Sequence, residues 1–413
     1  MDNIIKKGFY KRARVNDALN ILIENVNTLG TEKVKIKNSP SRVLAKDIKA
    51  PFDIPPFDRS AVDGYAVKAE NTFGASQTNP VYFKITGSAP IGKFPDIKVN
   101  DFEAVKVMTG TPIPEGADGV VMFEYTRESG GRIEVIKPLS PGRNISFRGE
   151  DVRKGDILLE RGMPIRPQDV GMLASFGMTD IPVHKKPKVA IISTGDELIN
   201  PEENLTKGKI FDSNSYMLTA LILKYNGFVE KTYTLKDDYN LIREKIQQSL
   251  DSNCDLILLT GGTSAGEHDF IPWIVNELGR ILVHGISMRP GMPTGFGIVD
   301  EKIIFMLPGN PAAVFAAFEF FIISALQKMG GMKIGNPHHV IECTLKRKIP
   351  SMTGRSDFVR VRVEKSGGEN FAEPVRSGGS GLISSLVKTQ GFVIVPENKE
   401  GFEKGEKVKV NLY

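Results

Sequence analysis

The chain of 413 residues is too long to fold around a single core, so two to four domains are expected. Its 40% hydrophobic and 25% charged residues place it among folded soluble proteins and exclude a disordered chain. A net charge of +5 is too small for a nucleic-acid-binding stripe, so no nucleic-acid partner is expected, although an anionic substrate would fit.

Cysteine content and apolar runs indicate the compartment. Cys254 and Cys343 lie far apart without CxxC spacing, which argues against a disulfide framework and a structural zinc site and favours a reducing cytoplasm. The N-terminus has basic residues but no apolar run of signal-peptide length. The apolar block from Ala312 to Leu326 is shorter than a bilayer span and contains Glu319. We therefore interpret it as a buried core helix and expect no membrane association.

The first third of the chain predicts one helix followed by extended segments. Apolar residues between Val15 and Val26 recur at helical spacing. Prolines then interrupt PFDIPPFDRSAVDGYAV, which presents Ser60 and Asp63 on a semi-rigid backbone. This segment is either a turn-rich surface loop with solvated charges or a loop that carries these residues to a site elsewhere.

A small β module is expected from Val81 to Val135. Its predicted strands are VYFKITG, AVKVMTG, GVVMFEY and RIEVI, separated by glycine, proline and asparagine turns. Thr109 and Gly110 end the second strand. They form either a simple turn or a hydroxyl-and-amide site for an oxyanion.

From Lys188 strands and helices alternate, which predicts a parallel α/β sheet. The strand VAIIS ends at STGDEL, Asn214 and Asp238 are predicted helix caps, and a LKDD turn precedes the second helix. Ligands bind beyond the carboxyl ends of the strands in such sheets. Three acidic positions should therefore share one rim with a glycine loop: Glu197, Asp237 or Asp238, and Asp269.

The glycine loop follows the buried strand Leu256 to Leu259 in DLILLTGGTSAGEHDF. Gly261, Gly262 and Ser264 allow close approach of a phosphate, and a predicted helix from Phe270 directs its N-terminal amides to the same crevice. An anion-binding loop beside carboxylates suggests a bridging divalent cation such as Mg²⁺. The alternative is an ordinary strand-to-helix turn.

The remaining segments add one candidate cation and a second β region. Arg289 stands beside a Pro-Gly turn and could clamp a phosphate or carboxylate. After Gly331 the pattern is entirely strand-like, which predicts a C-terminal β-barrel or sandwich.

Taken together, the ordered motifs PPFDRSAVDGYAV, MTGTPIPEGADGVVM, GEDVRKGD, STGDEL, FDSNSYML, TGGTSAGEHDF, RPGMPTGFG and LPGNPAA closely resemble the molybdopterin molybdenumtransferase family, of the MoeA and gephyrin E-domain type. The resemblance covers nearly the whole chain. It implies an α/β multidomain fold, in which a central doubly wound α/β domain of the molybdopterin-binding type accompanies an inserted β module and a C-terminal β-barrel. The implied domains are a discontinuous linking region (27–49 and 141–185), the β module (50–140), the α/β domain (9–26 and 186–330) and the barrel (331–413).

The resemblance also implies an activity in the cytoplasm: molybdate, or tungstate, is inserted into adenylated molybdopterin and AMP leaves with Mg²⁺ assistance. It implies a homodimer with a shared site and, as a possible partner, the molybdopterin adenylyltransferase. Carried over residue by residue, the expected catalytic residues are Asp63, Thr109, Glu197, Asp238 and Asp269, of which Glu197, Asp238 and Asp269 would bind the metal. The expected substrate-binding residues are Ser60, Gly261, Gly262, Ser264, Arg289, Pro308 and Arg355.

Some positions depart from the bacterial pattern, and two rival functions follow from the same motifs. Gly285 and Met292 stand where lysines are familiar, and Gly381 where a histidine is common. A molybdopterin adenylyltransferase shares a TGG loop, but its usual continuation differs from Ser264 to Asp269 and the additional domains would be superfluous. A non-catalytic molybdopterin-binding scaffold is the second rival, which the retained acidic positions disfavour.

Overall fold

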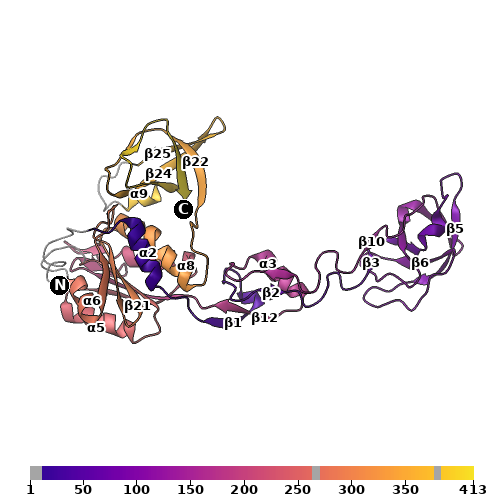
Figure 1. Ribbon diagram of the computed structural model, residues 1–413, viewed down its shortest axis with the longest axis horizontal. Coiled ribbons are helices and arrows are strands. Elements are labelled where there is room, and N and C mark those ends of the chain that lie inside the picture. The colour runs from indigo at the N-terminus through magenta and orange to yellow at the C-terminus, as the bar shows by residue number, and fades with distance from the viewer. Residues whose placement is uncertain (1–11, 263–269, 376–382) are drawn as a thin grey trace. The chain divides into compact units, whose positions relative to one another are not determined.

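The computed structural model describes residues 12–262, 270–375 and 383–413, which belong to two compact units (Figure 1). The first unit comprises the described parts of Met1–Lys46, Gly162–Pro167 and Asp180–Tyr413, and the second comprises Asp47–Arg161 and Gln168–Thr179. The expected division into four domains at the boundaries given above stays a prediction.

A six-stranded sheet forms the centre of the first unit, in the order β16-β13-β17-β21-β20-β18. Four strands are parallel: β13 (Lys188–Thr194), β16 (Phe228–Leu235), β17 (Leu256–Thr260) and β21 (Lys302–Leu307). Of the other two, β20 (Gly295–Val299) runs antiparallel to both of its neighbours, β21 and the edge strand β18 (Arg280–His284), and the expected parallel sheet did not include this reversed strand. The reason is local, because Asp300 and Glu301 both have positive φ (47° and 64°) and close a two-residue hairpin between β20 and β21.

Helices cover both faces of this sheet, which confirms the doubly wound α/β architecture. Side chains alternate along β13, so that Val189 and Ile191 enter one hydrophobic core while Ala190 and Ile192 enter the other. The first core is covered by α2 (Val15–Asn25), α4 (Asn214–Lys224), α7 (Pro311–Ala317) and α8 (Ile323–Met329), and the second by α5 (Tyr239–Leu250) and α6 (Phe270–Leu278).

The apolar helix near the end of this part is a core helix. Helices α7 and α8 are joined by a π-helical turn, Phe318–Ile322, and together they run from Pro311 to Met329. This 19-residue helix is long and apolar enough to cross a membrane, yet 72% of its most apolar 18-residue stretch is buried inside the protein. Its hydrophobicity is therefore explained by packing against the sheet, as predicted.

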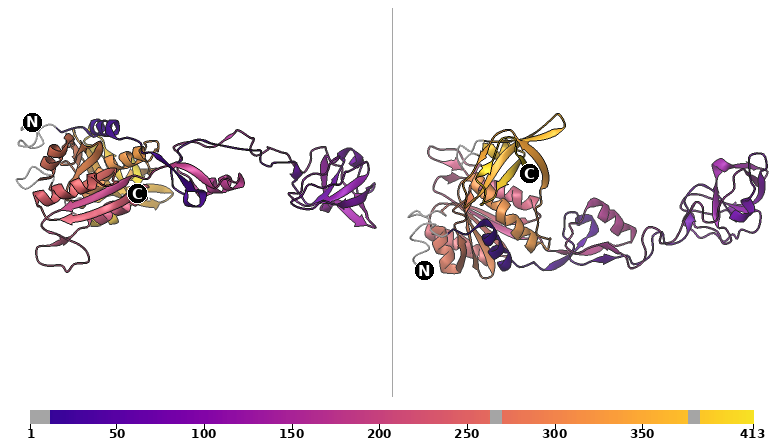
Figure 2. Two further views of the ribbon diagram at one scale, coloured as in Figure 1. Left: turned by 90° about the horizontal axis from the view of Figure 1, so that it is seen from below. Right: turned by 45° about the horizontal axis from the view of Figure 1, so that its top comes forward.

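The C-terminal region of the first unit forms the predicted closed β-barrel. Its strands are β22 (His339–Leu345), β24 (Ser356–Ser366), β25 (Glu369–Pro374), β26 (Gly391–Val395) and β28 (Lys407–Leu412), and pairing of β24 with β26 closes the ring. Phe358 and Phe392 stack at 4.3 Å between ring centroids and belong to the same core as the long helix. The barrel, yellow in Figure 2, lies next to the orange helices in both views.

The second unit contains the predicted inserted β module, a six-stranded sheet in the order β7-β4-β6-β5-β9-β8. Its two faces each bury a small core, because Tyr65 and Val67 point to one face and Ala66 to the other. Its strands are β4 (Gly64–Val67), β5 (Val81–Ser88), β6 (Glu103–Val107), β7 (Gly119–Met122), β8 (Thr126–Ser129) and β9 (Arg132–Val135).

Short elements complete the two units. The second unit adds the antiparallel pairs β2 (Ile48–Lys49) with β11 (Ile157–Leu159) and β3 (Arg59–Ser60) with β10 (Ile145–Ser146), and the helix α3 (Pro167–Ser175). The first unit adds β1 (Thr31–Lys35) with β12 (Asp180–His184), β14 (Leu198–Ile199) with β15 (Ile210–Phe211), β23 (Ile349–Pro350) with β27 (Gly401–Phe402), β19 (Met288–Arg289), which pairs with β24, and the helix α9 (Ser384–Val387).

Candidate functional site

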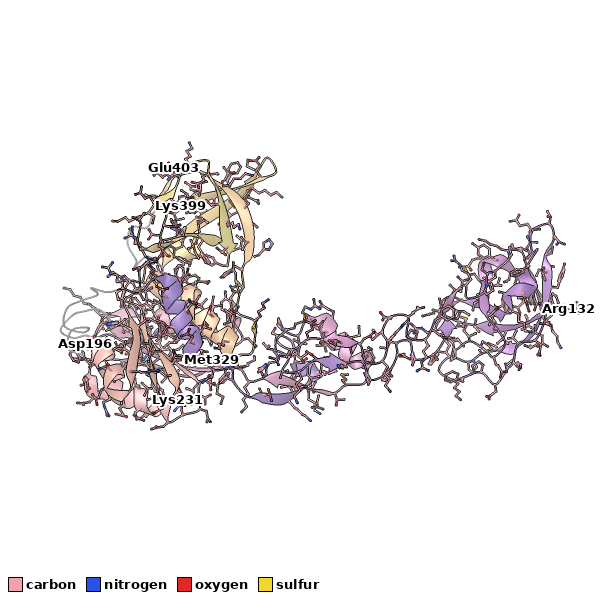
Figure 3. All side chains as sticks on the ribbon, viewed as in Figure 1. Arg132, Asp196, Lys231, Met329, Lys399 and Glu403 are labelled. Carbon is pink, nitrogen blue, oxygen red and sulfur yellow. The ribbon has the colours of Figure 1, made fainter. Side chains whose placement is uncertain are left out.

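The carboxyl ends of the parallel strands in the first unit meet around a cavity of about 330 Å³. Residues that follow β13, β17 and β21 line it, as expected for ligand sites of open α/β sheets. Four of the predicted site residues come together here: Glu197, Gly261, Gly262 and Pro308. Asp196, the second residue after β13, is labelled in Figure 3.

Glycine is required at the first position of the loop after β17. Gly261 has a φ of +92°, and a Cβ built on it would lie 2.1 Å from the carbonyl oxygen of Thr194. Its N–H donates to the carbonyl of Leu307 at 3.2 Å, so this amide joins β17 to the end of β21. The predicted residues Ser264 and Asp269, together with His268, lie outside the described residues.

The two aspartates of the LKDD turn have different roles. The carboxylate of Asp238 accepts a hydrogen bond from the Leu241 N–H at 2.8 Å and caps α5, as the helix-cap prediction expected. Asp237, not Asp238, lines the cavity together with Glu197. The sequence could have indicated this difference, because a side chain that caps a helix is engaged with the helix backbone. Asp238 stands in the N-cap position, so Asp237 is the aspartate that can line the rim.

The cavity is acidic. Three carboxylates line it, Glu197, Asp212 and Asp237, and among the described lining residues there is no Lys or Arg. Asp212 is buried and accepts hydrogen bonds from the Ser215 N–H at 3.1 Å and the Thr234 hydroxyl at 3.0 Å, which gives it a structural role. Burial raises the pKa of Asp237, and the carboxylates of Asp196 and Glu197 raise it further.

Asn214 connects this rim to the loop after β21 and does not cap α4 as predicted. The helix starts at Asn214 itself, with Ser213 in the N-cap position. The Asn214 side-chain amide instead donates to the carbonyl of Gly309 at 2.7 Å. A tertiary hydrogen bond to the Pro308-Gly309-Asn310 turn has thus replaced the local cap.

A second, larger cavity of about 1100 Å³ adjoins the acidic one, since Pro293, Pro308 and Asn310 line both. It lies where the loop 285–294 meets the barrel, and it contains the predicted residues Arg289 and Arg355. The lining is strongly basic. Among the described residues, its lining includes one carboxylate, Asp357, and six cationic side chains: Arg12, Arg289, Arg347, Lys348, Arg355 and Arg360.

Arg355, which directly precedes β24, and Arg360, which lies within it, differ in how their charge is balanced. Arg355 Nε lies 2.8 Å from the Asp357 carboxylate, so its charge is locally neutralised. Arg360 is only 3% exposed, donates to the Ser385 hydroxyl at 2.7 Å, and has no carboxylate within ion-pair distance among the described residues. Burial lowers its pKa. Arg360 was not among the predicted site residues, although it is in phase with the buried residues Ser356 and Phe358 along a strand, where side chains alternate with period two.

The second unit brings together two other predicted residues. Asp63 accepts hydrogen bonds from the Thr109 N–H at 2.7 Å and from the Thr109 hydroxyl at 2.8 Å. These bonds lower the pKa of Asp63, so the exposed carboxylate is ionised at neutral pH. Ser60 is buried, and its hydroxyl donates to the Val62 carbonyl at 2.5 Å, so this side chain holds the turn and does not face solvent.

Comparison with known proteins accounts for almost the whole chain. Residues 13–177 match the MoeA N-terminal region (domains I and II), residues 190–328 a probable molybdopterin-binding domain, and residues 342–413 the MoeA C-terminal region (domain IV).

Individual relatives extend over similar lengths. A protein of Methanocaldococcus jannaschii named for molybdopterin biosynthesis is 43% identical over 92% of both chains. The molybdopterin molybdenumtransferase of Staphylococcus aureus is 34% identical over 96% of this chain and 95% of its own. The crystal structure of the molybdopterin biosynthesis MoeA protein of Pyrococcus horikoshii superposes with a TM-score of 0.84 at 39% identity, covering 98% of this chain and 100% of that one. This chain therefore belongs to the MoeA family of molybdopterin molybdenumtransferases.

Proposed function

We propose that this protein inserts molybdate into adenylated molybdopterin, with release of AMP assisted by Mg²⁺, in the biosynthesis of the molybdenum cofactor. The observation that carries the proposal is the pair of adjoining cavities of opposite charge. An acidic cavity suits a divalent cation and the phosphates it neutralises, and a basic cavity suits an oxyanion substrate. The names of the relatives, which specify molybdopterin and molybdenum transfer, support this choice of substrates.

The donor set of the acidic cavity fits Mg²⁺. This ion prefers oxygen ligands and is usually held by one or two carboxylates together with substrate phosphates and water. Glu197 and Asp237 supply two carboxylates, while in the described part of the chain no group of three His, Cys, Asp or Glu residues could hold a metal by itself. Glu197 and Asp237 would thus hold the ion, whereas Asp238, engaged as a helix cap, would not.

When bound, Mg²⁺ supplies charge neutralisation for the bridging phosphates as AMP leaves. The residues of the chain would position the phosphate and the cation. Gly261 and Gly262, which carry no side chain at the end of β17, would offer backbone to a phosphate, and Glu197 and Asp237 would hold the cation. Asp269 and Ser264 of the same loop are proposed to complete this arrangement.

The basic cavity would bind molybdate, or tungstate, as a tetrahedral dianion. Arg289 and Arg360 provide guanidinium groups that no carboxylate of the described chain neutralises. Pro308 lines both cavities, so an oxyanion in the basic cavity would lie next to the proposed phosphate region. Arg355 would act mainly through Asp357, with which it forms an ion pair.

The test is AMP release from adenylated molybdopterin with Mg²⁺, in parallel reactions with molybdate, tungstate or no oxyanion, with the metal content of the pterin product assayed. We expect release to depend on an oxyanion and metal to be present in the product. Binding of the substrate without release would instead indicate a scaffold. Adenylation of unmodified molybdopterin from ATP would indicate an adenylyltransferase, the enzyme class that in our proposal supplies the substrate in the cytoplasm.

We further propose a homodimer in which the Asp63–Thr109 pair of one subunit serves the site of the other. The exposed and ionised Asp63 has the charge expected of a residue that binds a cation. A 1:1 mixture of Asp63→Asn and Glu197→Gln subunits should recover about a quarter of wild-type activity, because half the dimers are mixed and each retains one intact site. Mixing Glu197→Gln with Asp237→Asn subunits is the control and should recover nothing. Absence of recovery in verified Asp63/Glu197 heterodimers would contradict a shared site.

A further inference from the structure

The segment Arg12–Arg14 is held against the wall of the basic cavity by its main chain. Ala13 pairs with Ile286 in a parallel bridge: its N–H donates to the Gly285 carbonyl at 3.0 Å, and its carbonyl accepts from the Ser287 N–H at 2.8 Å. Loop 285–294 is bound on another side by the barrel, where the Ser356 N–H donates to the Ser287 carbonyl at 2.9 Å. The position of Arg12 is therefore set by the backbone and does not depend on its own side chain.

The six cations of this cavity fall into two groups. Three have a carboxylate partner within the molecule: Arg347 pairs with Glu373 at 3.1 Å, Lys348 with Glu403 at 2.5 Å and Arg355 with Asp357 at 2.8 Å. The other three, Arg12, Arg289 and Arg360, have no ion-pair partner among the described residues. Three guanidinium groups without internal counter-ions thus line one concave surface. They repel one another, and a bound anion would neutralise this repulsion.

We propose that Arg12 is a third anion-binding residue of this cavity, which holds a tetrahedral oxyanion together with Arg289 and Arg360. The inference rests on the proposed function, since molybdate is the oxyanion that the reaction consumes. A guanidinium presents a planar fork of donors to two oxygens of such an anion. The same chemistry would recognise a phosphate group of the nucleotide or of the pterin, so both sources are tested.

The test is calorimetric titration of the full chain with sodium molybdate, sodium tungstate and, separately, AMP, without pterin substrate. Removal of a hydrogen bond to a charged group weakens affinity about tenfold or more. Arg12→Ala should therefore raise the Kd for the tetrahedral metal oxyanions about tenfold, and Arg12→Lys should restore part of the affinity because it retains the charge but not the fork.

Arg14 is the matched control, because it lies two residues away, has the same charge and forms its ion pair with Glu397 at 3.6 Å outside the cavity lining. Arg14→Ala should leave all three affinities unchanged, and both variants should melt at the wild-type temperature. In turnover assays Arg12→Ala should raise the KM for molybdate with little change in kcat.

Two outcomes would overturn the assignment: wild-type Kd values for molybdate, tungstate and AMP in Arg12→Ala, or an equal weakening in Arg14→Ala, which would indicate only a general effect of net charge. Weakening confined to AMP would support the site and assign Arg12 to the phosphate. Because these titrations need no turnover, they remain decisive if AMP release from adenylated molybdopterin is not observed.

Discussion

Asp237→Ala should slow Mg²⁺-dependent AMP release by on the order of 100-fold, equivalent to about 3 kcal/mol of transition-state stabilisation. Asp237 lines the acidic cavity with Glu197, and no cationic side chain of the described lining compensates its charge. Without it the cation would keep only Glu197 of the two carboxylates proposed to hold it. The measurement is the initial rate of AMP release as a function of Mg²⁺ concentration.

Asp238→Ala is the matched control, since the two residues are adjacent in the same turn. Its carboxylate caps α5 by accepting the Leu241 N–H at 2.8 Å, so its removal should lower the free energy of unfolding by about 1 kcal/mol. AMP release at saturating Mg²⁺ should remain near the wild-type rate. The reverse pattern, with activity lost in Asp238→Ala and kept in Asp237→Ala, would assign the metal to the helix cap.

The pH dependence of stability gives an independent readout of Asp237. Its pKa is raised in the folded protein by burial and by neighbouring carboxylates, so the folded state binds this proton more tightly than the unfolded state. Ionisation of Asp237 therefore lowers the free energy of unfolding. This loss is absent at pH values below the unfolded pKa of about 3.9 and complete at pH values above the folded pKa. Asp237→Asn should raise the Tm at neutral pH, and this gain should disappear as the pH falls below about 4. Such exchange of stability for function is common at binding sites.

Glu319→Ala should lower the free energy of unfolding of the first unit by roughly 3–5 kcal/mol, the usual loss when one partner of a buried ionisable pair is removed. Both side chains of the pair are only 4% exposed, and His338 Nε2 lies 2.6 Å from the Glu319 carboxylate. His338 Nδ1 donates to the Leu412 carbonyl at 2.8 Å. The pair thus joins the π-helical turn of the long helix to the last strand of the barrel, and truncation would leave a buried imidazole without its acceptor.

An exposed pair in the same barrel provides the control. Lys348 and Glu403 are 58% and 70% exposed, so Glu403→Ala should cost no more than about 1 kcal/mol. Urea unfolding followed by the fluorescence of Trp273, the single tryptophan of the chain, reports on the α/β part directly. A loss in Glu319→Ala no larger than that in Glu403→Ala would show that the buried pair does not hold the two parts together.

Local patterns in the sequence were sufficient for the elements of the fold. Period-two and period-3.6 repeats and the positions of glycine and proline predicted the α/β sheet, the inserted β module and the C-terminal barrel, all of which the structure contains. The antiparallel edge of the sheet was not expected, because the paired positive φ angles of Asp300 and Glu301 lie in a turn without glycine.

The sequence by itself indicated the family through its ordered motifs. It also determined the elements and the rim at which Glu197 and the glycine loop meet, because these follow from local periodicity and from strand direction. Tertiary structure alone decided which polar and charged side chains line a cavity. Asp237 lines the cavity while Asp238 caps a helix, Ser60 turns inward, and the guanidinium groups of Arg12 and Arg360 reach one cavity from positions 348 residues apart. The physical reason is that alternation fixes the face of a residue on its own element, whereas the neighbours of that face depend on how distant segments pair and pack.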